Sequence, residues 1–111
     1  MVLDIPTLGM ALRALYWIKD ELGYPVGCGA HNAVGLWRGA TQKLGKQVIK
    51  PANVVATAMA VAAGADFVLY GPIDHADVVL PVIGMMSASY GQLSIEDGKR
   101  LPSNHPRFKI A

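Results

Sequence analysis

The sequence predicts an α/β fold made of three consecutive β-α units around a parallel sheet. Three short apolar runs each end in a polar or glycine-rich tip, and each leads into a segment with helical spacing of apolar residues. The runs are VLDIPTLG at 2–9, PVGCGAHNAV at 25–34 and FVLYGPID at 67–74. Strands that alternate with helices form parallel sheets, and such folds carry their functional groups at the carboxyl ends of the strands. We therefore expect the functional residues at these three tips.

The length of the chain predicts an incomplete (β/α)8 barrel. A closed barrel of this kind needs about 250 residues, whereas this chain has 111. We assign 1–96 to the C-terminal part of a barrel domain and 97–111 to a polar C-terminal tail. Val2 already falls in the first strand, so both outer strands would expose unpaired backbone groups. We therefore expect pairing with an N-terminal remainder of the barrel or with further copies of the chain.

The first unit is predicted to be a strand that includes Val2, followed by a long helix. Apolar residues recur every three or four positions, Pro6 suits the start of the helix, and Gly23 suits its end. The recurring positions are Leu8, Ala11, Leu12, Leu15, Ile18 and Leu22. The charged segment 19–21 would then face water.

The second and third strands are predicted at 25–29 and 66–70. Gly27 and Gly29 in the second strand allow a backbone or a ligand to approach closely. The third strand is a continuous apolar run, as found in parallel strands that are covered on both faces. Gly71 follows it directly and turns the chain.

Three more helices are predicted at 34–44, 51–63 and 76–90. Pro51 and Gly64 mark the start and the end of the middle helix, following the usual asymmetry of helix termini. Pro81 is compatible with the last helix because it lies near the first turn.

Composition and charge exclude several classes of protein. Hydrophobic residues make up 52% of the chain, charged residues 16%, and the net charge is +2. No aromatic residues alternate with the small basic cluster of Lys43, Lys46 and Lys50, so nucleic-acid binding is not expected. The most apolar stretches, 54–65 and 78–88, are shorter than the roughly 20 residues that span a membrane. We therefore expect no membrane span.

The cysteine content and the lack of a recognisable secretory signal predict a cytoplasmic protein. Cys28 is the single cysteine, which excludes an internal disulfide and fits a reducing compartment. Asp4 and Pro6 interrupt the start of the chain, and no basic region precedes an apolar one, so no secretory signal is expected.

Two polar residues at strand tips are candidates for ligand binding. Asp4 is either a hydrogen-bond acceptor for a ligand or a cap for the helix that follows Pro6. Asn32 follows the second strand, and its amide can both donate and accept hydrogen bonds. Its alternative role is to cap the next helix.

No metal or nucleotide motif is present in the sequence. His31, His75 and His105 lie in two different tips and in the tail, without HxH, HExxH or CxxC spacing. GCGAHN at 27–32 does not match GxGxxG, and no GKS or GKT occurs. We therefore expect no metal, and we interpret Cys28 as a small buried apolar residue.

Three segments carry a resemblance to a known family: VLDIPTLG at 2–9, GYPVGCGAHNA at 23–33 and GADFVLYGPID at 64–74. In order and spacing they resemble the C-terminal part of the H subunit of tetrahydromethanopterin S-methyltransferase and its bacterial relatives. That family is related to methyltetrahydrofolate:corrinoid methyltransferases and to the pterin-binding domain of cobalamin-dependent methionine synthase.

The resemblance implies that the three units are the sixth, seventh and eighth of a pterin-binding TIM barrel. In the related folate enzymes, an aspartate at the sixth strand hydrogen-bonds the pterin, and an asparagine at the seventh reaches the nitrogen that carries the methyl group. Asp4 and Asn32 match these positions. The implied substrate-binding residues are thus Asp4, Asn32, Gly29 and Gly71, with Asn32 as the catalytic residue. The family's other pterin ligands come from earlier strands, so the chain alone is expected to be inactive.

The implied activity is methyl transfer in one-carbon metabolism, as in methanogenesis. The methyl group would pass from methyl-tetrahydrofolate or methyl-tetrahydromethanopterin to the Co(I) corrinoid (cobalamin) of a partner protein. The leaving group is a poor tertiary amine, so a hydrogen bond to it must strengthen in the transition state. One alternative is a pterin-binding synthase of the dihydropteroate synthase type. A basic residue at a strand tip would then be expected to bind a phosphate-like group, and none of the three tips contains Lys or Arg. A second alternative is a non-catalytic piece used in assembly or docking.

Overall fold

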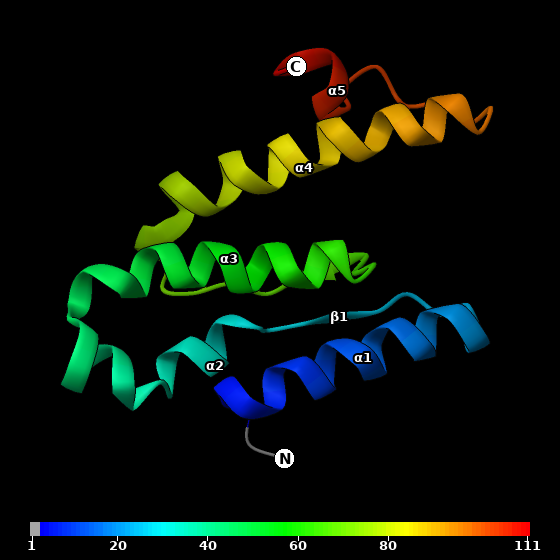
Figure 1. Cartoon of the computed structure of the whole chain (residues 1–111). Helices are drawn as coiled ribbons and strands as arrows, with labels where there is room; N and C mark the ends of the chain where they lie inside the picture. Colours follow the sequence, from blue (N-terminus) through cyan, green and yellow to red (C-terminus); the bar gives the residue numbers. More distant parts are fainter. Residues whose placement is uncertain (1–2) are drawn as a thin grey trace.

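The computed structural model describes residues 3–111, which form mostly helices and one two-stranded sheet (Figure 1). In chain order the elements are α1 (Ile5–Leu22), β1 (Gly27–Cys28), α2 (His31–Gly35), η1 (Ala40–Leu44), η2 (Lys46–Val48), α3 (Ile49–Ala62), β2 (Phe67–Val68), η3 (Ile73–His75), α4 (Ala76–Glu96) and α5 (Pro106–Lys109). Of the short turns, η1 is a π-helix, and η2 and η3 are 3-10 helices.

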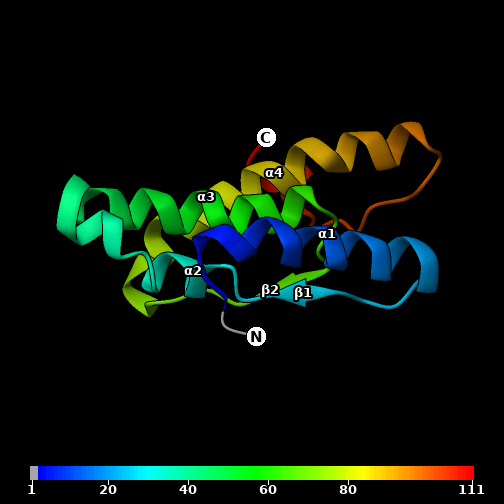
Figure 2. The same ribbon diagram turned by 60° about the horizontal axis from the view of Figure 1, so that its bottom comes forward.

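The two strands pair in parallel, which confirms the predicted direction of the second and third units. Gly27 lies opposite Phe67, and Cys28 lies opposite Val68. A Cβ at Gly27 would collide with the backbone oxygen and ring of Phe67, so glycine permits the close approach of the strands. Figure 2 shows α1 and α3 on the same side of the strands.

The first helix begins close to where Pro6 predicts its start, but no strand precedes it in the described residues. Val2 lies outside the described residues, Leu3 and Asp4 form no strand, and α1 begins at Ile5. Asp4 and Thr7 form a capping box, and Pro6 stands in the first turn. These signals for a helix start outweigh the apolar character of the run.

The rest of α1 confirms the predicted helix. Leu8, Leu12 and Leu15 are buried on one face, and Gly23 ends the helix in the left-handed conformation with φ 71°. The main core lies between α1, α2 and α3. Its buried members are Leu8, Leu12, Ala30, Ala33, Val34, Ala56 and Ala60.

The helix predicted at 34–44 is wrong in its extent. The helix α2 begins at His31, and the backbone N–H of Asn32 donates a hydrogen bond to the Gly29 carbonyl. It ends at Gly35, and the separate π-turn η1 follows. Gly35 and Gly39 flank the interruption, where their conformational freedom weakens a continuous helix.

The two longest remaining helices pack against each other. The α3 helix confirms the helix predicted at 51–63, while α4 continues beyond residue 90 to Glu96. Pro81 lies inside α4, which begins at Ala76, so it stands just beyond the first turn near which it is predicted. Lys50 and Asp77 join the two helices by an exposed ion pair of 3.0 Å.

The segment 97–111 folds back onto α4 (Figure 1). It contains α5, for which His105 Nδ1 accepts a hydrogen bond from the Arg107 amide. Arg107 Nε also donates to Gln92 Oε1 of α4 at 3.1 Å. A Cβ at Gly91 would lie 2.7 Å from the His105 ring, so glycine permits this contact.

One helical segment in the described part of the chain, Ile73–Glu96, is long and apolar enough to cross a membrane by length and composition alone. The stretch 78–88 is too short to span a membrane, but the continuous segment Ile73–Glu96 has 24 residues and is long enough. A single such helix is weak support for a span, because packed helices of soluble proteins share these properties. The absence of a membrane span stays a prediction.

Candidate functional site

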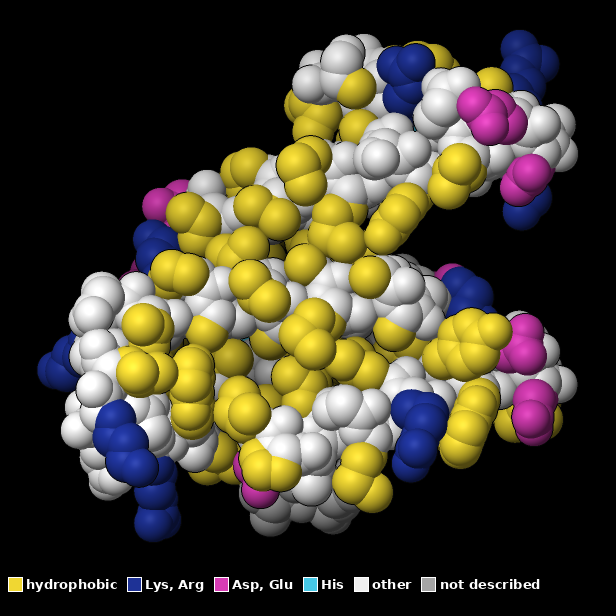
Figure 3. Space-filling model, viewed as in Figure 1, with side chains coloured by type: hydrophobic (Ala, Val, Ile, Leu, Met, Phe, Trp, Pro, Cys, Tyr) yellow, Lys and Arg dark blue, Asp and Glu magenta, His cyan; other side chains and the backbone are white. Residues whose placement is uncertain are grey.

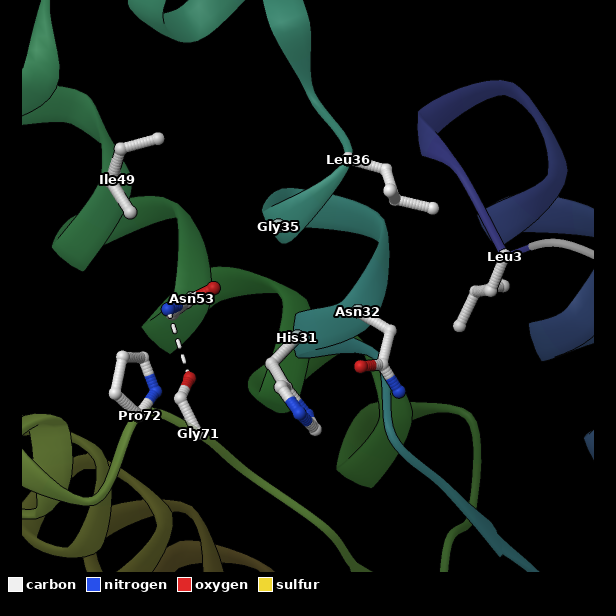
Figure 4. Close-up of a pocket in the computed structure, with 9 residues that line it drawn as sticks. All are labelled: Leu3, His31, Asn32, Gly35, Leu36, Ile49, Asn53, Gly71 and Pro72. Carbon is white, nitrogen blue, oxygen red and sulfur yellow. Dashed lines mark hydrogen bonds between the residues drawn. The ribbon is translucent and has the colours of Figure 1, made fainter.

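The carboxyl ends of β1 and β2 meet beside an open pocket with a volume of about 820 Å³ (Figure 4). The lining comes from α2, from the segment after β2, from the start of α3 and from the residue before Asp4. The lining residues are Leu3, His31, Asn32, Gly35, Leu36, Ile49, Asn53, Gly71 and Pro72. The structure thus brings together the tips of the second and third predicted units.

Asn32 presents a free amide at this pocket. Figure 4 shows its side chain and that of His31 extending side by side from the start of α2. The residue at the cap position is Ala30, so Asn32 does not cap the helix. Within residues 3–111 the Asn32 side chain makes no hydrogen bond, and it is exposed. Its donor and acceptor atoms are therefore available to a ligand.

His31 is anchored through one ring nitrogen. Its Nδ1 lies 3.1 Å from the carbonyl oxygen of Leu69. A carbonyl only accepts hydrogen bonds, so Nδ1 carries the proton. In the neutral ring Nε2 then has a free lone pair. No hydrogen bond reaches that nitrogen within the described part of the chain.

Two glycines leave room for these side chains. A Cβ at Gly29 would lie 2.9 Å from Asn32 Nδ2 and 3.3 Å from the His31 ring. A Cβ at Gly71 would lie 3.3 Å from both Cδ2 and Nε2 of His31. Gly71 lines the pocket, whereas Gly29 is not among its lining residues. Neither glycine has a positive φ, so the reason for glycine is space and not backbone conformation.

Asn53 is a pocket residue that the sequence analysis missed. Only 4% of its surface is exposed, and its Nδ2 donates to the Gly71 carbonyl at 3.1 Å and to His75 Nδ1 at 2.8 Å. Its Oδ1 is buried without a partner among the described residues. The available signal was a pair of polar residues, Asn53 and Thr57, one turn apart on the alanine-rich face of α3.

Asp4 acts as the cap of α1. Its Oδ1 accepts hydrogen bonds from the Thr7 amide at 2.9 Å and from Thr7 Oγ1 at 2.7 Å. These two bonds hold the pKa of the Asp4 carboxyl below its usual value. Asp4 does not line the pocket, although the preceding residue, Leu3, does. The structure therefore shows the capping role that the sequence left open, and the ligand role stays a prediction.

The polar residues at the third tip mainly hold helices together. Lys50 holds the pKa of Asp77 below its usual value through their hydrogen bond, and His75 contacts Asn53.

Burial raises the pKa of the Cys28 thiol, so it is protonated at neutral pH. Among residues 3–111, no group of three or more His, Cys, Asp or Glu side chains could hold a metal ion.

The pocket lies at the ends of two parallel strands, each followed by helical segments, and its lining contains no carboxylate, ammonium or guanidinium group. Its polar groups are two amides and one imidazole, and no Lys, Arg, Asp or Glu lines it. Such a lining can hydrogen-bond a polar ring and contains no Lys or Arg to bind a phosphate.

Comparison with known proteins confirms the family resemblance. The family described as "Tetrahydromethanopterin S-methyltransferase MtrH subunit" matches residues 1–101, and this chain belongs to it. The H subunit of tetrahydromethanopterin S-methyltransferase from Methanosarcina acetivorans is 35% identical over 109 residues, covering 92% of this chain and 34% of the relative. The same protein from Methanothermobacter marburgensis is 33% identical over 104 residues, with the same coverage of 92% and 34%.

A third relative has a different name. The H subunit of the putative methyltransferase mtx from Methanosarcina acetivorans is 36% identical over 102 residues, covering 86% of this chain and 33% of the relative. The chain thus spans about a third of the length of the curated relatives it matches.

Proposed function

We propose that this chain forms one wall of the substrate site of a methyltransferase that uses methyl-tetrahydromethanopterin as the methyl donor. The observation that carries the proposal is the free Asn32 amide at the carboxyl end of β1, in a chain of the MtrH family. The names of the relatives specify tetrahydromethanopterin, which favours this carrier over tetrahydrofolate. The uncharged lining also gives no support to a synthase that must hold a phosphate-like group.

The remaining two-thirds of the relatives' length completes the site in this proposal, either in the same polypeptide or in a partner. Two short strands leave backbone groups unpaired at the edges of the sheet. Hydrophobic side chains also gather over α3 and α4 (Figure 3). The exposed large hydrophobic residues of these helices are Val55, Met59, Leu80, Met85, Tyr90, Leu93 and Ile95. Completion of a (β/α)8 barrel would cover both features, and a homo-oligomer is the competing arrangement.

The role of Asn32 follows from the chemistry of the leaving group. Methyl transfer breaks the bond between the methyl carbon and the pterin nitrogen, and electron density builds up on that nitrogen. An amide N–H directed at the nitrogen stabilises this charge more in the transition state than in the ground state. The methyl acceptor in this proposal would be the Co(I) corrinoid of a partner protein.

Asp4 takes a second role in this proposal. The Asp4 carboxyl is ionised at neutral pH, and the hydrogen bonds from Thr7 hold its pKa below the usual value. A carboxylate can accept two N–H groups from the pterin edge and so orient the ring. The ligand contact would therefore add to the helix cap that the structure shows.

A titration experiment tests both the carrier and the completion of the site. Methyl-tetrahydromethanopterin and methyl-tetrahydrofolate are titrated by calorimetry into the enzyme that carries this chain and, in parallel, into the isolated 111-residue chain. We expect the enzyme to bind the methanopterin form and the isolated chain to bind neither form. Tight binding of the folate form alone would contradict the carrier assignment, and equal binding by the isolated chain would contradict the need for completion.

A further inference from the structure

The contact with Leu69 fixes the tautomer of the neutral His31 ring at the pocket. Its Nδ1–H donates to the Leu69 carbonyl, which leaves Nε2 of the neutral ring as an acceptor. Leu69 follows β2, whereas His31 follows β1, so the contact ties together the ends of the two paired strands. This contact fixes which nitrogen is available for other interactions.

The residue packed beside the Nε2 edge of the ring has no side chain that could cover Nε2. Gly71 lies against this edge, and a Cβ there would come within 3.3 Å of Nε2. The Gly71 carbonyl is held by Asn53 Nδ2, which is on the buried side chain of α3. His31, Gly71 and Asn53 all line the same pocket (Figure 4). The segment after β2 is therefore fixed in a position that leaves space beside Nε2.

We infer that His31 is a further substrate-binding residue, whose Nε2 accepts a hydrogen bond from an N–H group of a heterocyclic substrate. The inference rests on the proposed function and adds a third hydrogen-bonding residue to Asp4 and Asn32. Asn53 is a positioning residue in this arrangement, because it acts through the Gly71 carbonyl. The contact is made in the ground state, so His31 contributes to affinity more than to the rate of methyl transfer.

Two substitutions at the same position separate the two nitrogens of the ring. Asparagine places its amide close to the position of Nδ1, and glutamine places its amide close to the position of Nε2. His31→Asn can keep the contact with Leu69 but loses the acceptor in the pocket. His31→Gln keeps an acceptor in the pocket but loses the Leu69 contact. If the ring only anchored Leu69, the asparagine variant would be the better binder.

The experiment measures the affinity of the enzyme that carries this chain for tetrahydromethanopterin by calorimetry. We expect His31→Asn to weaken binding by about three- to tenfold, the value of one neutral hydrogen bond, and His31→Gln to bind more tightly than His31→Asn. Gly71→Ala should also weaken binding, whereas Gly9→Ala is the matched control because a Cβ there meets open space. Thermal melting of each variant checks that the fold is intact.

The outcomes distinguish this inference from the proposed function. If the unsubstituted enzyme binds no pterin, the proposed function fails, and the inference fails with it. If the enzyme binds pterin but His31→Asn binds as well as or better than His31→Gln, only the inference fails. A spectroscopic measurement is independent of the ligand: the ¹⁵N spectrum of the neutral His31 ring should show a protonated Nδ1. A protonated Nε2 would overturn the inference.

Discussion

The two ends of the parallel strand pair differ in how completely their polar groups are hydrogen-bonded. At the amino end, Asp66 accepts hydrogen bonds from Lys19 Nζ and from the Val26 amide, both at 2.9 Å. At the carboxyl end, the Asn32 amide has no partner and Asn53 Oδ1 is buried without one, within the part of the chain that the structure describes. Asp66 is thus paired at the amino end, whereas Asn32 and Asn53 retain unused hydrogen-bonding capacity at the carboxyl end.

This difference separates groups that hold the fold from groups that are free to bind. The Lys19–Asp66 contact ties α1 to the segment before β2, and Lys19 Nζ also donates to the Gly64 carbonyl at 2.8 Å. In β-α barrels, residues at the amino ends of the strands typically serve stability, and those at the carboxyl ends serve catalysis. An unsatisfied buried acceptor such as Asn53 Oδ1 costs about 1–3 kcal/mol. Its presence at the carboxyl end favours a functional reason for that residue.

The largest expected effect comes from Asn32, at the carboxyl end. In the complete enzyme, Asn32→Ala should lower kcat for methyl transfer on the order of 10²–10³-fold, by analogy with the loss of one preorganised donor to a developing negative charge. Pterin affinity should fall much less, because the contact strengthens mainly in the transition state. Single-turnover methyl transfer to a Co(I) corrinoid measures the rate, and calorimetry measures the affinity.

Asn104→Ala is the matched control for this substitution. Asn104 is an exposed asparagine in the segment after α4 and does not line the pocket. Its replacement should leave both rate and affinity unchanged. A rate defect in His31→Ala that exceeds the defect in Asn32→Ala would contradict the catalytic assignment, because it would favour a histidine acid at the leaving nitrogen.

The helix ends could be predicted from the sequence because they depend on neighbouring residues. Gly23 and the start of α3 near Pro51 follow from local conformational preferences. At the start of the chain, Leu3 and Asp4 form no strand, and Val2 lies outside the described residues. The capping box of Asp4 and Thr7 is also a local signal, and it competes with the apolar run that it interrupts.

The pocket could be predicted only in part. The tips of β1 and β2 meet because parallel strands end at the same edge, so Asn32 and Gly71 follow from the pattern of units. Asn53 could not be placed, because its partners Gly71 and His75 lie 18 and 22 residues further along the chain. Only the packing of α3 against the segment after β2 brings these residues together.

Asp4 provides an intermediate test, because it has a structural role and a proposed ligand role. Asp4→Ala removes the cap and should lower the melting temperature by a few degrees. Asp4→Asn keeps a side chain that caps well, so it should affect stability less, yet it removes the charge that the pterin edge would meet. Calorimetric pterin affinity measured in the complete enzyme decides between the roles.

The expected result for Asp4→Asn is weaker pterin binding with a nearly unchanged melting temperature. Asp74→Asn is the control, since Asp74 is an exposed carboxylate at the third tip that does not line the pocket. Unchanged affinity in Asp4→Asn, together with a lower melting temperature in Asp4→Ala, would show that Asp4 serves only as a cap.

The smallest expected effect concerns the amino end, and it appears only in acid. Hydrogen bonds from Lys19 and from the Val26 amide hold the pKa of Asp66 below its usual value of 3.8. A carboxyl whose folded pKa is lowered stabilises the fold above its unfolded pKa, and this contribution is lost as the pH falls through the folded pKa. Asp66→Asn should therefore reduce the loss of stability below about pH 4, measured by urea unfolding at several pH values. It should leave pterin affinity at neutral pH unchanged. A fall in affinity as large as that in Asp4→Asn would contradict the division between the two ends, because it would show that the amino end also controls the pocket.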